Sequence, residues 1–205
     1  MTPKRKNMTP KIKKPSAMPS TFDQSVEFML QFRSVDDRSA VILAGAMLEV
    51  LVGSLLAKSM KPSETARDPI LDERGVISSL YAKAQLSYRL NLIDKATFRA
   101  IDLIRDIRNT YAHKLEYSNL SDEPYASQIG EIYNTFSWYL PYTKAAKYIF
   151  GAEETGSMQF KSMAVFVISR LERAIDAQKV ISPDSPFPFT PDKWHALRPP
   201  PASEA

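Results

Sequence analysis

The chain has 205 residues, 44% of them hydrophobic and 24% charged, which is the balance of a soluble globular protein with one well-cored domain. It contains no cysteine and only two histidines, which excludes disulfides, thiolate nucleophiles and cysteine-ligated metal, so we expect no metal site. It also has no phosphate-binding glycine loop, and we expect no cofactor. The net charge is +4, but residues 1–20 alone carry +6, which leaves −2 for residues 21–205.

Prolines mark both ends of the chain. Four of the first 20 residues and seven of the last 24 are proline, which disfavours helix. We therefore predict a disordered basic tail over residues 1–20, a single helical domain over 21–180 and a Pro-rich, extended tail over 181–205. No apolar block follows the basic stretch, and the uncharged run of residues 40–48 is shorter than the ~20 residues of a membrane span. We expect a cytoplasmic protein that does not enter a membrane.

The first half of the predicted domain begins with a short helix and continues with a long one. Thr21 and Gln24 have the spacing of a capping box, which predicts a helix to about Phe32. The stretch "DDRSAVILAGAMLEVLVGSLLAKSM" then begins with acids and is apolar around most of its circumference. This pattern predicts a central helix that several neighbours bury, with Gly45, Ala46 and Gly53 permitting close approach.

Two further helices follow a loop over residues 61–75 that contains two prolines and a glycine. "VISSLYAKAQLSYRL" has apolar residues at helical spacing and predicts a helix over residues 76–90. A short break at residues 91–92 precedes the next helix, for which Asp94 is the expected N-cap. Its apolar side should pack inward and consists of Ala100, Leu103, Ile104, Ile107 and Tyr111.

The remaining sequence predicts two more helices, over residues 125–140 and 157–178, and nothing in it alternates as a strand would. The fold class is therefore all-α: an irregular helical bundle of about five to seven helices with disordered or extended tails.

A polar stripe runs along the helix that ends near residue 113. Residues four apart on a helix nearly superpose, which places on one side Asp102, Arg105, Asp106, Asn109 and His113. The stripe is either a solvated charged face or a surface for a ligand or another chain. Arg108 lies about 140° from His113 on a regular helix, so the two meet only if the helix loosens or a second copy completes the site.

Glu49 is the single acid inside a run that otherwise indicates core. A buried carboxylate needs a partner, and the forked guanidinium of Arg108 is a candidate. In one interpretation this pair only joins two helices, and in the other it supports a site.

Residues 36–116 resemble the mannitol operon repressor family of bacterial helical proteins. The most specific parts are the turn "LDERG", the helix "SLYAKAQLSYRLNLID" and the segment "IRDIRNTYAH", whereas Val76 stands where the family pattern has proline. The resemblance implies a non-enzymatic protein of transcriptional regulation that acts through dimerisation or protein contacts. Direct sequence-specific DNA binding is not expected, because the body carries −2 and shows no basic recognition helix.

The hexapeptide from Arg108 to His113 is also similar to the signature of the HEPN superfamily, whose catalytic members cut RNA without metal and pair two chains. The resemblance implies an alternative function, a metal-independent endoribonuclease. A third hypothesis is a toxin-antitoxin or phage-defence component, which would share this chemistry and add an inhibitor partner. Arg108 would hold the phosphate charge, His113 would move the proton and Asn109 would orient the imidazole. Many relatives in this superfamily bind or regulate without cutting, and the regulatory function is our leading hypothesis. His195 lies in the Pro-rich tail beside Trp194, which we expect to dock onto the body or a partner.

Overall fold

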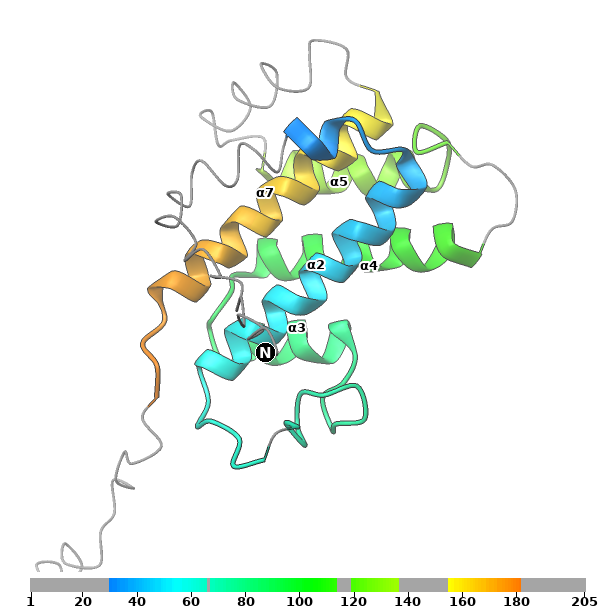
Figure 1. The fold of residues 1–205 in the computed structure, drawn as a ribbon. Helices are drawn as coiled ribbons and strands as arrows, with labels where there is room; N and C mark the ends of the chain where they lie inside the picture. Colours follow the sequence, from blue (N-terminus) through cyan, green and yellow to red (C-terminus); the bar gives the residue numbers. More distant parts are fainter. Residues whose placement is uncertain (1–29, 66, 114–118, 137–154, 182–205) are drawn as a thin grey trace, which may run out of the picture.

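The structure is a computed structural model that describes residues 30–65, 67–113, 119–136 and 155–181 (Figure 1). All regular secondary structure in these ranges is helical, which confirms the all-α prediction. The named helices are α2 (Asp37–Lys58), α3 (Leu80–Arg89), α4 (Lys95–His113), α5 (Tyr125–Phe136) and α7 (Gly156–Ala177). The expected capping box at residues 21–24, residues 137–140 of one predicted helix, and residues 1–20 and 182–205 of the two predicted tails lie outside the described residues.

Helix α2 lies at the centre of the bundle and packs against α3, α4 and α7. It begins after Asp36, whose carboxylate accepts a hydrogen bond from the Ser39 amide at 3.0 Å. Helix α7 runs alongside it in the same direction (Figure 1). The two helices are joined at both ends. Ser157 donates a hydrogen bond to Asp37 at 2.5 Å, and the Lys58 ammonium donates one to the Ile175 carbonyl at 2.5 Å.

Helices α3 and α4 form a hairpin that crosses α2. The turn between them uses Asn91 with a positive φ of 58°, and Asp94 caps α4 as predicted by accepting from the Thr97 amide at 2.8 Å. The predicted start of α3 at residue 76 is wrong. Ser79 caps the helix, and the preceding chain instead forms a turn in which the Gly75 amide donates to the Asp72 carbonyl.

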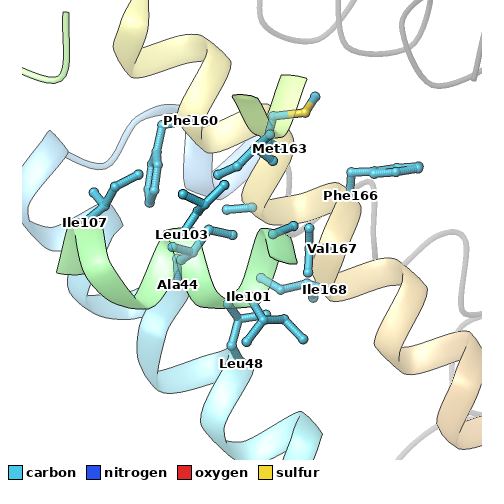
Figure 2. Packing of buried hydrophobic residues seen from close by; sticks show 14 of the residues in the cluster. Ala44, Leu48, Ile101, Leu103, Ile107, Phe160, Met163, Phe166, Val167 and Ile168 are labelled. Atoms are coloured by element: carbon cyan, nitrogen blue, oxygen red, sulfur yellow. The ribbon is translucent and has the colours of Figure 1, made fainter. Parts of the chain in front are cut away.

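The core forms where α2, α4, α5 and α7 meet. Figure 2 shows part of this cluster, with labelled side chains from three of these helices: Ala44, Leu48, Ile101, Leu103, Ile107, Phe160, Met163, Phe166, Val167 and Ile168. The predicted apolar side of α4 is buried in it, since the exposed fraction of each side chain there is 6% or less. Helix α5 is also held to α4 by a two-pronged contact between Arg99 and Glu131 at 2.7 and 3.0 Å.

The prediction that neighbours bury α2 on most sides is wrong. One side forms the core, but the other is open, and Val50 there is 66% exposed. We call the apolar part of this side the exposed α2 face; it comprises Ile42, Leu43, Ala46, Val50, Ala57 and the half-buried Gly53. Within the described part of the chain, α2 is also the one helix long and apolar enough to cross a membrane by those two criteria, although its buried side supplies the core.

Candidate functional site

A cleft of about 450 Å³ opens where α2, the start of α3 and the second half of α4 meet. Residues from all three helices line it: Gly45, Glu49, Ser79, Leu80, Tyr81, Arg105, Arg108 and Asn109. Four of them, Glu49, Arg105, Arg108 and Asn109, are residues that the sequence singled out. The cleft therefore brings most of the predicted site residues to one place.

Arg108 reaches the cleft by crossing over α2 at Gly45. A Cβ atom at residue 45 would lie 3.0 Å from the Arg108 Cγ, so the absence of a side chain there lets the arginine stem lie close to the helix. The exposed guanidinium donates a hydrogen bond to the Asn109 side-chain oxygen at 3.2 Å. Among the described residues, no carboxylate forms an ion pair with Arg108, so its charge is available to a ligand.

Arg105 contacts several neighbouring side chains, unlike a residue on a freely solvated charged face. Its guanidinium lies 4.8 Å from the centre of the Tyr81 ring and 2.6 Å from Asp106. Asp102 is 2.9 Å away as an ion pair, although the two groups are not aligned as a hydrogen bond. The Arg105 Nε is buried without an acceptor. The polar stripe is therefore a half-buried network that fixes the direction of Arg105.

Glu49 is not the buried partner of Arg108 that we predicted. Its side chain is 42% exposed and lies 3.7 Å from the ammonium of Lys83, whose side chain is only 9% exposed. The physical reason is the position of residue 49 at the edge of α2, where the cleft admits water. Glu49 and Arg108 thus line the same cleft without forming an ion pair, and Lys83, which the sequence analysis missed, holds the acid.

The motif from Arg108 to His113 is described only in part. His113 is the last residue of α4. Its side chain lies outside the described atoms, so the contact between His113 and Arg108 stays a prediction. Asp102 lies behind the cleft and supports Arg105. The sequence analysis missed Tyr81 as a lining residue. Its helical spacing suggested packing, whereas the side chain is 43% exposed and covered in part by Arg105.

Comparison with known proteins supports the fold. No protein-family model and no curated protein matches the chain. Two solved structures are similar to it. One is the X-ray structure of the MtlR-HPr complex from Escherichia coli, with a TM-score of 0.52 and 17% identity over 77% of this chain and 99% of the matched chain. The other is the crystal structure of a possible transcriptional regulator, YggD, from Shigella flexneri 2a str. 2457T, with a TM-score of 0.51 and 16% identity over 79% and 98%.

At these identities the likeness shows a shared fold. It is the fold that the resemblance to the mannitol operon repressor family led us to expect, and it gives no support to the HEPN-like interpretation of the hexapeptide.

Proposed function

We propose that this chain is a non-enzymatic regulatory protein that acts through contacts with other proteins. The observation that carries the proposal is the exposed α2 face, where Ile42, Leu43 and Val50 are 45%, 39% and 66% exposed on the same side of a single helix. The largest apolar patch on a soluble protein, about 300–600 Å², is often a functional surface. The two similar structures support the proposal, since one is of a complex between two proteins and the other is described as a possible transcriptional regulator.

The cleft supplies the polar rim that such a contact needs. Gly45 and Glu49 lie in the cleft and are also neighbours of Ala46 and Val50 on α2, so the apolar face and the cleft are continuous. Arginine and tyrosine are enriched among residues that dominate binding energy at protein interfaces, and here Arg108 and Tyr81 are both accessible. A partner would bury apolar side chains against α2 and place an acceptor against the free guanidinium.

The alternative function, a metal-independent endoribonuclease with RNA as its substrate, is favoured by one observation. Arg108 and Asn109 lie in the same cleft, and the guanidinium is free of ion pairs among the described residues. His113 would complete the set through a loosened helix end or a second copy. We rank this function below regulation because a shared fold is a poor guide to activity.

Complementation of a deletion strain tests the regulatory proposal. Deleting the gene should change the abundance of a small set of transcripts, and expression of the wild-type chain should restore them. Val50→Asp should fail to restore them, because it places a charge at the centre of the exposed α2 face. Val180→Asp is the matched control, since Val180 is 70% exposed but follows α7. Full restoration by Val50→Asp, or no change on deletion, would overturn the proposal.

A further inference from the structure

The exposed α2 face carries a line of uncharged residues in which small side chains leave shallow steps beside larger ones, and we call this line the furrow. Along it, Leu43, Ala46, Val50, Gly53 and Ala57 follow at alternating intervals of three and four residues, which keeps them in one line on a helix. Small residues alternate with larger ones, and at Gly53 an added Cβ would meet nothing within 4 Å. No charged residue stands in this line. The furrow therefore suits an apolar segment of chain.

The size of the furrow indicates what covers it. A helix of 22 residues is about 33 Å long, and one open side about 10 Å wide offers roughly 300 Å². A stable protein interface buries about 800 Å² on each partner. The face alone is thus too small for a stable pair of copies, whereas a single extended segment of chain would fill it.

The C-terminal tail starts near the C-terminal end of α2, the helix that carries the furrow. Lys58 at the end of α2 contacts the carbonyl of Ile175 in the last turn of α7, and the described chain ends four residues after α7, at Ile181. The remaining 24 residues, "SPDSPFPFTPDKWHALRPPPASEA", contain Phe187, Phe189 and Trp194. An extended chain covers about 3.1 Å per residue, so the tail reaches far beyond the ~22 Å of helix between Lys58 and Leu43.

Other segments fit the furrow less well. Residues 1–20 are basic and contain no aromatic residue. The residues that flank the segment 137–154 lie on another side of the bundle, where Phe136 packs edge to face against Phe166 and the Gly156 amide donates to Ser121. Residues 21–29 contain Phe22 and Phe28 but join the described chain at Leu30, ahead of α2. The C-terminal tail combines three aromatic residues, a start near the C-terminal end of α2 and sufficient length.

We propose that the C-terminal tail lies along the exposed α2 face in the same chain, with Phe187 and Phe189 in the furrow around Val50. Because the tail is tethered, its local concentration is in the millimolar range, so a weak contact is enough to hold it there. The inference rests on the proposed function in one respect: the tail occupies the surface that we assign to protein partners, and a partner must displace it.

Because the native chain has no cysteine, an introduced thiol is the only one that a maleimide can label. Val50→Cys introduces a single thiol in the furrow, and Val76→Cys introduces the control thiol in a loop where residue 76 is 89% exposed. In the full chain, we expect the thiol at position 50 to react with a bulky maleimide at least fivefold more slowly than after the added changes Phe187→Ser and Phe189→Ser. The thiol at position 76 should react equally fast in both backgrounds.

Repeating the labelling at several protein concentrations distinguishes the tail of the same chain from a second copy. Protection by the tail is independent of concentration and is lost with the two phenylalanines, and a peptide of residues 182–205 added at millimolar concentration should restore it. The rates are compared at low concentration, where the chain is a monomer. Protection that is absent there and appears only as the concentration rises would overturn the proposal in favour of a second copy. Equal reaction rates in both backgrounds would also overturn it, and would leave the transcript result with Val50→Asp, and hence the proposed function, intact.

Discussion

Arg108 lies across Gly45, and its Cγ is 3.0 Å from the point where a side chain on residue 45 would begin. This relationship fixes the position of the one free guanidinium described in the cleft, and it gives the first prediction. Gly45→Ala should leave the free energy of unfolding nearly unchanged, because the gain of about 1 kcal/mol in helix propensity is offset by displacement of the arginine stem. Gly53→Ala, with no neighbour to meet, should stabilise the protein by roughly 0.5–1 kcal/mol.

Urea unfolding measures both values. The double variant Gly45→Ala/Arg108→Ala should recover the full propensity gain, because the displaced stem is absent. An equal stabilisation by Gly45→Ala and Gly53→Ala would show that Arg108 does not depend on residue 45.

The lowered pKa of Asp94 in the folded state should make the stability of the protein depend on pH. Burial raises the pKa of Asp94, but hydrogen bonds from the Thr97 side chain and amide, together with the Arg170 charge, outweigh burial and lower the pKa in the folded state. The stabilisation is therefore complete above the ordinary carboxyl pKa of about 3.9 and is lost as the pH falls through the lower folded value. Asp94→Asn keeps the cap but removes the charge, so its melting temperature should approach that of the wild type as the pH falls from about 5 to 2.

Asp176→Asn, at an exposed acid of α7, is the control for this series. A constant difference in melting temperature between Asp94→Asn and the wild type at every pH would contradict the proposed role of the Asp94 charge.

Removing the buried ammonium of Lys161 should lower the free energy of unfolding substantially. Its side chain is 5% exposed, and its ammonium donates to the Val35 carbonyl at 2.5 Å and lies 3.7 Å from Asp37. Lys161→Met keeps most of the stem but leaves the carbonyl and the acid without this partner, which should cost about 1–3 kcal/mol. Thermal or urea unfolding measures the loss. The matched change Lys179→Met, at an exposed residue after α7, should have little effect.

The absence of RNA cleavage is expected if the protein is a regulator. Purified protein incubated with labelled RNA and a metal chelator should leave the RNA intact. Cleavage that is lost in both Arg108→Ala and His113→Ala would instead establish the ribonuclease alternative. Cleavage that neither substitution reduces would point to a contaminant.

A homodimer, expected from both resemblances, should be weak because the exposed α2 face is small. Light scattering should give a mass near the 23.1 kDa of one chain at low concentration and rise toward twice that value as concentration increases. Val50→Asp should remove the rise, and Phe187→Ser/Phe189→Ser should shift it to lower concentration. A strict monomer at high concentration in the latter variant would rule out the homodimer and any site shared between two copies.

The sequence predicted those features that depend on neighbours along the chain. Asp94 as a cap and the buried side of α4 follow from local rules, and both are confirmed. Prediction from the sequence failed for features that depend on which helices pack together. The apolar composition of α2 could not reveal that only one side is covered, and the burial of Glu49 depended on a cleft that exists only once α3 packs beside α2. The contact of Arg108 with Gly45 likewise arises where α4 crosses α2, and the spacing of residues along one helix cannot predict that crossing.

The paired ends of α2 and α7 govern how the protein can be made. The contacts that join these helices span 117 and 120 residues of sequence, so the chain must close a long loop before they form. During synthesis, the part of α2 that packs against α7 emerges early and stays uncovered until α7, the last helix of the described chain, is made. A nascent chain therefore carries this part of its future core uncovered for most of its translation, which makes early chaperone contact and aggregation of prematurely ended chains direct consequences of this helix order.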